Sequence, residues 1–558
     1  MQGEKFGGEQ KKYWVFFTDK NGVSFNPFEY FDPKTIENRL FQNIPLIDSS
    51  DFPLNENYVS IVKGEVDSAS YCSRWFNGMA VIATGNQIEK IKSFQFVKNI
   101  EPMESESALC SNNKKSGKFF PSPLLLPPPE TFDTALSEKN RLLMKNQTKR
   151  MGGEDFEKMN LDGKGIRIAV FDAGFPTVDF SPTFEHLRKD KRILKTWDFV
   201  KNKEFVYGFN EHGTMVLSCI AGKTGNEKTG LATGSEFILA RTEMAQREPF
   251  SEEENWLAAV EWADKNGANI ISSSLAYTYH RYFRKNMDGK TSLVSKAATM
   301  AASKGILVVN AAGNDGNNEW KIIATPSDAD SVLSVGGISP GSDYHINFSS
   351  FGPTSDKRMK PNVCAYGQVI VSGKKGLEES FGTSFATPLV AGFAACAWQK
   401  KRSFTNMELF REIEKSGHLY PYFDYAHGFG IPQAGYFINE NNNPADSTFE
   451  IVNEKYVLKV LISDEFFGDN NVDGALDSLH TKNNSEINSE LDNRGAVPKT
   501  DYGSDYLYYH IENSEGTLDK YFVIRVDKKE VLELNKDDFP AGKKLMVFYK
   551  GYSETFTF

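Results

Sequence analysis

Three short segments of this chain of 558 residues carry side chains that could together hydrolyse an amide. Asp172 ends an apolar run and precedes a glycine turn, His212 precedes an apolar stretch, and Ser384 follows a glycine turn. A serine hydroxyl needs a nearby base to become a nucleophile, and an imidazole needs a carboxylate to hold its tautomer. These residues predict a catalytic triad in which Ser384 attacks, His212 takes its proton and Asp172 orients His212.

A fourth segment offers a donor for the negative oxygen that amide hydrolysis creates. Asn314 follows the apolar run 306–311, and its side-chain amide carries N–H groups. Together with the backbone N–H of Ser384 it would form an oxyanion hole with two donors. Each residue alone also has an ordinary explanation as a turn former or helix cap, but the set favours hydrolysis.

The elements around these residues predict an α/β domain. Between residues 163 and 439, continuous apolar runs alternate with amphipathic stretches, a pattern that indicates a mostly parallel sheet flanked by helices. The expected strands are 166–171, 237–240, 270–275, 306–311, 332–335 and 369–371, and the expected helices are 212–221, 252–265, 292–303, 384–398 and 405–415. We expect this domain to span residues 150–440.

Three further regions differ from it in composition. Residues 13–103 contain short apolar runs and a helix-like stretch, which predict a small α+β unit. Residues 104–149 include the run Pro-Ser-Pro-Leu-Leu-Leu-Pro-Pro-Pro and predict an exposed linker, because proline removes backbone donors. Residues 441–558 alternate apolar and polar residues between turn-rich gaps, which predicts a small β-sandwich-like domain.

Composition excludes several classes of protein. The chain is 40% hydrophobic with 44 glycines and 23 prolines, so it is not collagenous or of low complexity. The net charge of −10 argues against nucleic acid as a partner. The 5 cysteines include no Cys-x-x-Cys pair, which argues against a disulfide scaffold and a zinc site. No apolar run is long enough to predict a transmembrane segment.

The motifs resemble those of the subtilisin-like serine proteases, the subtilase family. Residues 382–388 read Gly-Thr-Ser-x-Ala-x-Pro, and the order of Asp172, His212 and Ser384 is that of the family. Similarity extends to 349–353, 360–361, 427–430 and Ala434, and covers about residues 160–440. The resemblance implies a serine endopeptidase that works through an acyl-enzyme and needs no cofactor. Asn314 takes the place of the family's oxyanion asparagine.

The resemblance also implies where substrate binds. The edge Ser274, Leu275, Ala276 and Tyr277, facing Ala312 and Gly313, would line the substrate. Ala276 and Tyr277 stand where the family has glycines, so we expect a primary pocket with a different preference. Protein or peptide chains would add as a strand along this edge.

Residues 13–103 resemble the inhibitor-type propeptide of the same family. The chain would therefore be a zymogen whose propeptide is an intramolecular inhibitor and whose linker holds the cleavage sites. Basic residues of the linker are either cleavage sites or, as we favour, solvated charge. This resemblance favours an exported protein (secreted, periplasmic or at the cell surface) whose signal peptide is missing from this sequence, although a cytosolic location stays open.

Two alternatives remain at this stage. A polar stretch with Asp469, Asn471 and Asp473 is partly like a structural calcium loop, but His480 stands where a closing glutamate is expected, so an ordinary turn is favoured. The second is a binding or scaffold protein that keeps the fold and never loses its propeptide. Labelling of Ser384 by a phosphonylating probe would distinguish that protein from an enzyme.

Overall fold

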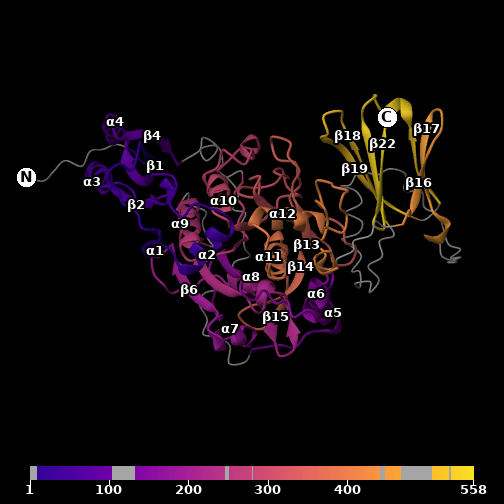
Figure 1. Ribbon diagram of the computed structural model, residues 1–558, viewed down its shortest axis with the longest axis horizontal. Coiled ribbons are helices and arrows are strands. Elements are labelled where there is room, and N and C mark those ends of the chain that lie inside the picture. Colours follow the sequence, from indigo (N-terminus) through magenta and orange to yellow (C-terminus); the bar gives the residue numbers. More distant parts are fainter. Residues whose placement is uncertain are drawn as a thin grey trace, which may run out of the picture.

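The computed structural model describes residues 9–103, 132–244, 251–278, 281–439, 446–466, 506–526 and 529–558. Three units follow one another along the chain and lie in a row (Figure 1). The central unit carries the predicted site, with an α+β unit on its amino-terminal side and a β unit on the other.

The central unit is built on a parallel sheet of 7 strands. Its order is β13 (Val363–Tyr366), β12 (Val332–Ile338), β11 (Leu307–Ala311), β10 (Ile270–Ser273), β5 (Arg167–Asp172), β9 (Glu236–Arg241) and β6 (Ile193–Asp198). All six neighbouring pairs are parallel, so the carboxyl ends of the strands lie along one edge. This architecture confirms the predicted α/β fold.

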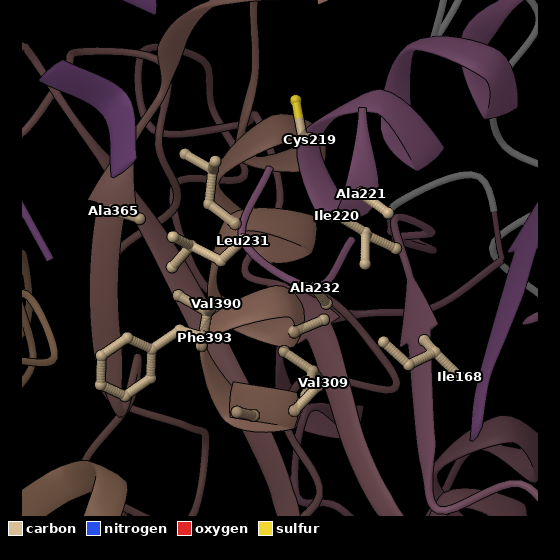
Figure 2. Packing of buried hydrophobic residues seen from close by; sticks show 14 of the residues in the cluster. Ile168, Cys219, Ile220, Ala221, Leu231, Ala232, Val309, Ala365, Val390 and Phe393 are labelled. Carbon is tan, nitrogen blue, oxygen red and sulfur yellow. The ribbon is translucent and has the colours of Figure 1, made fainter. Parts of the chain in front are cut away.

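Helices cover both faces of this sheet because its strands are apolar on both sides. Ile168 and Val170 of β5 face the cluster formed with α8 (His212–Ala221) and α11 (Thr383–Lys400), part of which is shown in Figure 2. Ala169 and Phe171, the alternate residues, face α9 (Ser251–Lys265) and α10 (Leu293–Ser303). Both clusters therefore fix the strand ends from which the predicted site projects.

The amino-terminal unit has an antiparallel sheet in the order β2 (Ser68–Ser73), β3 (Gly78–Thr84), β1 (Gln10–Phe17) and β4 (Val97–Pro102). Helices α3 (Glu56–Glu65) and α4 (Gly85–Lys92) complete its core. A long insertion after β1 carries α1 (Pro27–Tyr30), α2 (Pro33–Phe41) and the short helix η1 (Ser49–Asp51), and α2 reaches the central unit (Figure 1). The predicted α+β unit is confirmed, and the insertion is an addition to it.

The carboxyl-terminal unit is strand-rich, as predicted. One sheet contains β16 (Phe449–Asn453), β17 (Val457–Ile462) and β20 (Glu530–Asn535). The other contains β19 (Leu518–Arg525), β18 (Tyr506–Glu512), β21 (Lys544–Tyr549) and β22 (Tyr552–Thr557). Side chains of both sheets, such as Leu458 and Val547, share one buried cluster.

The structure differs from the expectations at one domain boundary and in the place of one strand. The end of the expected linker is helix α5 (Glu138–Lys149), in which Leu143 and Met144 are buried in the central core and the Gln147 amide donates to the carbonyls of Thr229 and Ile370. The expected strand 369–371 is confirmed as β14 (Gln368–Ser372), but it lies outside the main sheet, in a hairpin with β15 (Leu377–Phe381) that leads into α11. No helix in the described ranges is long and apolar enough to span a membrane.

Candidate active site

Asp172 ends β5 at the carboxyl edge of the sheet and has no exposed surface. Its carboxylate accepts the N–H of Ala173 at 2.7 Å, and both of its oxygens lie 2.9 Å from Nδ1 of His212. A carboxylate can only accept here, so Nδ1 of His212 carries the hydrogen and Nε2 keeps its lone pair. The pair therefore presents a ring nitrogen that can take a proton.

His212 is the first residue of α8, and the Asn210 side chain accepts its backbone N–H at 2.8 Å. The close approach of this helix to β5 requires glycine at 213. A Cβ on Gly213 would lie 2.3 Å from the carbonyl oxygen of Gly174 and 2.9 Å from Cβ of Asp172. The His-Gly dipeptide is thus the local reason that the imidazole reaches the carboxylate.

Ser384 lies in the first turn of α11 and is 7% exposed, as is His212. The imidazole of His212 lies beside the ring of Phe385, with centroids 5.4 Å apart, so the helix start and the His–Asp pair are neighbours. The Ser384 hydroxyl donates to the carbonyl of Ser274 at 3.3 Å, and the Ser274 hydroxyl donates to the carbonyl of Ser384 at 2.8 Å. Catalytic hydrogen bonds often tighten only once substrate is bound.

Asn314 is exposed and its orientation is fixed by α11. Its Oδ1 accepts both the backbone N–H and the hydroxyl of Thr383 at 2.9 Å, so Nδ2 is turned away from Thr383. The point where a Cβ on Gly382 would lie is 3.6 Å from Nδ2 of Asn314 and 3.6 Å from the backbone N of Ser384. Gly382, with φ of +147°, thus lies beside two N–H donors, and a side chain at this position would contact both of them.

The predicted substrate edge is only partly open. Leu275 and Tyr277 have no exposed surface, and the Tyr277 ring lies beneath the guanidinium of Arg281 at 4.3 Å. The backbone of Tyr277 pairs with Thr325. Ala276 is the one residue of the four that is half-buried, so the bulk of Tyr277 fills the interior and does not narrow an open groove.

The other predicted wall is next to Asn314. Ala312 and Gly313 are buried, and the backbone of Ala312 exchanges hydrogen bonds with Val335 and Ala324 at 3.0 Å. These bonds hold the segment before Asn314 on the sheet. The roles of Ala312, Gly313 and Ser274–Tyr277 toward substrate remain predictions.

The metal candidates of the sequence were compared with the described residues. They contain no group of three or more His, Cys, Asp or Glu residues that could hold an ion. The candidate calcium residues Asp469, Asn471 and Asp473 lie outside the described residues.

Sequence reasoning missed the residues that hold the amino-terminal unit on the central one. Glu261 of α9 is buried there and accepts the Ser73 hydroxyl at 2.5 Å and the backbone N–H groups of Arg74 and Trp75 at 3.1 and 3.3 Å. Burial raises the pKa of Glu261, although these hydrogen bonds act in the opposite direction. In the sequence, a glutamate on the apolar side of a helix could have indicated this contact between the units.

The insertion forms a second contact, which we call the clamp (residues 27–51). Arg39 of α2, fully buried, lies 2.6 Å from Asp51 of η1 and 2.6 Å from Asp264 of α9. Lys304, which follows α10, lies 3.1 Å from Asp51. Two cations and two carboxylates are thus buried together between the units, and burial raises the pKa of Asp264 to about 6 despite Arg39.

Comparisons with known proteins agree with this geometry. Residues 163–430 match the model of the Subtilase family, and residues 12–118 match the model described as "Peptidase S8 propeptide domain, Bacteroidota". The chain is 30% identical over 256 residues to the thermophilic serine proteinase of Bacillus sp. (strain AK1), and this match covers 45% of this chain and 56% of that protein. It is 29% identical over 288 residues to the serine protease AprX of Bacillus subtilis (strain 168), covering 46% and 62%.

Among solved structures, MycP1 from Mycobacterium smegmatis matches with a TM-score of 0.43 at 21% identity, over 55% of this chain and 88% of that one. The chain spans 56% and 62% of the lengths of the two curated relatives. The two family matches follow one another along the chain in the order that the fold shows, propeptide first. The chain is therefore a subtilisin-like protein of the subtilase family, with a peptidase S8 propeptide domain ahead of its central domain.

Proposed function

We propose that the chain is a serine endopeptidase made as a propeptide-inhibited zymogen. The observation that carries this proposal is the buried Asp172–His212 pair beside the start of α11, where the backbone N of Ser384 and Nδ2 of Asn314 both lie close to Gly382. Each part has the chemistry that acyl transfer needs: a base, a nucleophile and a preorganised oxyanion site.

In the proposed mechanism, Oγ of Ser384 bonds to the carbonyl carbon while its proton passes to Nε2 of His212. Asp172 stabilises the resulting imidazolium. The carbonyl oxygen becomes negative and receives hydrogen bonds from Nδ2 of Asn314 and the N–H of Ser384. His212 then gives its proton to the leaving amine, and a water molecule activated by His212 releases the acyl group.

Replacing Asn314 by alanine is expected to lower kcat by about 10²–10³ with little change in KM, because one oxyanion donor is lost. The measurement is steady-state hydrolysis of a peptide anilide by the chain after cleavage of its propeptide. Asn318→Ala is the matched control, since the Asn318 amide of the same loop donates to Asp315 instead. A kcat for Asn314→Ala equal to that of the control would contradict the assignment.

The zymogen proposal rests on two separate contacts of the propeptide domain, at Glu261 and at the clamp. It is tested by the intact mass of the chain and of Ser384→Ala, incubated side by side at neutral pH. We expect only the native chain to be split, within the stretch between residues 103 and 138. Splitting of both forms at the same rate would show that another protease cuts there.

An inhibitory propeptide favours an exported enzyme.

The clamp should loosen as pH rises. Asp264 has a raised pKa of about 6 when the clamp is docked, so the docked state binds a proton more tightly than the undocked state. Docking is therefore most favourable at a pH below the ordinary pKa of an aspartate, and it weakens as pH rises through about 6. The charged groups that face Asp264 are Arg39, Asp51 and Lys304. In the Ser384→Ala chain, we expect amide exchange of α2, corrected for the intrinsic rate, to be faster at about pH 7.5 than at about pH 5.

Asp264→Asn provides the control, because an amide does not titrate and Arg39 still keeps Asp51 as a partner. The variant should lose most of the pH dependence of α2 protection, with the remainder coming from Glu261 at the other contact. Protection that increases with pH in the parent chain would contradict the prediction.

A further inference from the structure

The carboxyl-terminal unit contacts the central unit through one face of β18. Tyr506, Tyr508 and His510 are alternate residues of this strand and therefore share a face. Tyr508 and His510 are 1% and 3% exposed. In the central unit, the ring of Tyr344 contacts Tyr506 and the ring of Tyr422 contacts Tyr508. Nδ1 of His510 is hydrogen-bonded to the backbone carbonyl of Phe423.

Beneath this face lies a second buried His–Asp pair. Nδ1 of His427 lies 2.9 Å from Oδ2 of Asp424, which also accepts the Tyr422 hydroxyl at 3.1 Å. Oδ1 of Asp424 accepts the backbone N–H groups of His427 and Ala426 at 2.7 and 2.8 Å. The Tyr508 ring covers the imidazole edge-on at 6.0 Å. Asp424 and Tyr508 thus fix the orientation of the His427 ring. Nδ1 is the hydrogen-bond donor to Asp424, which leaves Nε2 as an acceptor.

The acceptor nitrogen of His427 holds a turn of the central unit. Nε2 accepts the backbone N–H of His345 at 2.9 Å. His345 in turn donates from its own Nε2 to the carbonyl of Ser349 at 2.8 Å, and its ring stacks on Phe351 at 4.0 Å. His427 therefore anchors the start of the turn 345–351, and His345 closes it.

This turn carries the loop of Asn314. The backbone N–H of Ser350 donates to the carbonyl of Gly313 at 2.9 Å. The Ser350 hydroxyl accepts the backbone N–H of Asp315 at 3.2 Å. Both neighbours of Asn314 are thus bound to one residue of the turn.

We propose that His427 is a positioning residue for the oxyanion asparagine, and that the β18 face of the carboxyl-terminal unit holds His427 in place for this purpose. A continuous set of hydrogen bonds supports the proposal. It runs from Asp424 to His427 and His345, and then through the Ser349–Ser350 peptide to the two neighbours of Asn314. It rests on the proposed function, because it assigns Asn314 to the oxyanion.

The test begins with His427→Phe, which removes both hydrogen bonds and keeps a ring. We expect kcat to fall about tenfold with KM unchanged, since a small displacement of an oxyanion donor is costly in the transition state. In the Asn314→Ala background the same substitution should cause no further loss, because coupled residues are not additive. His418→Phe is the matched control: this histidine of the same segment accepts the N–H of Ile431 instead.

Two conservative variants keep the test decisive if His427→Phe does not fold. His427→Gln places an oxygen near the position of Nε2 and can still accept from His345, whereas His427→Asn can only replace the Nδ1 donor. We expect the glutamine variant to keep a higher kcat than the asparagine variant. The reverse order would overturn the proposal.

A second readout does not depend on activity. In the full chain with Ser384→Ala, His427→Phe should raise amide exchange across residues 312–318, and His418→Phe should not. Unchanged exchange there, an equal loss of kcat with and without Asn314, or an equal effect of His418→Phe would each overturn the positioning role. Raised exchange in a chain whose native form hydrolyses no peptide would instead refute the proposed function alone.

Discussion

Ser384→Ala is expected to lower kcat for peptide hydrolysis by about a million-fold. The hydroxyl at the start of α11 is the proposed nucleophile, and alanine leaves no atom that can form the acyl-enzyme. Donors at Asn314 and the Ser384 backbone persist in the variant, so a small residual rate over water should remain. The measurement is hydrolysis of a peptide anilide under single-turnover conditions, after an added protease has cut the linker of the native chain and of the variant alike.

The same experiment on His212→Ala should give a similar loss, and the double variant little more than either single one. Residues that act as one unit are not additive, so the pair distinguishes a shared proton path from two separate structural defects. Thr387→Ala is the control, because this buried hydroxyl of the same helix donates to the Thr383 carbonyl and has no part in the proposed reaction. A Ser384→Ala rate within tenfold of the native rate would contradict the assignment.

Asp172→Asn is expected to lower kcat by about 10⁴ while leaving the fold in place. An asparagine amide can donate to Nδ1 of His212, which would move the ring hydrogen to Nε2, the atom that must take the proton from Ser384. KM should change little, because Asp172 is fully buried and does not reach substrate.

Asp198→Asn is the matched comparison for that variant. Asp198 also ends a strand of the same sheet and is fully buried, but it pairs with Arg241 at 3.0 Å. We expect this change to lower the melting temperature and to leave kcat within about threefold, since it leaves a buried guanidinium with a weaker partner. Equal losses of kcat in the two variants would show that Asp172 acts only on stability.

The parts of the site that follow from local sequence were predictable. Each of Asp172, His212 and Ser384 stands where an apolar run meets a turn glycine, and the carboxyl ends of parallel strands share one edge. The structure brings all three to that edge. Asn314 was equally accessible to prediction, because it directly follows the apolar run of β11.

Elements with mixed polarity were not predictable. Helix α5 is polar over most of its length and is held by few buried residues, Leu143 and Met144 among them. Edge strand β6 has one buried residue, with the others half-buried or exposed, and lacks the continuous apolar run of its neighbours. In both cases the decisive contacts come from residues distant in the chain.

The direction of side chains and the contacts between units also could not be predicted from the sequence. Motif similarity placed Tyr277 near substrate, but only the fold shows that its ring points into the core under Arg281. The clamp joins Arg39 to Asp264 across 225 residues, and the His427 network joins β18 to the Asn314 loop. No local pattern predicts such long-range pairing of polar groups.

The central claim is that Ser384 is a nucleophile activated by His212. A fluorophosphonate probe tests it most directly, applied to the native chain and to His212→Ala after an added protease has cut the linker of both, and followed by peptide mapping. The account predicts one adduct, on Ser384, that forms in step with the loss of peptide hydrolysis and is abolished by His212→Ala. Hydrolysis that continues with Ser384 unlabelled, or labelling that is as fast in His212→Ala, would contradict it.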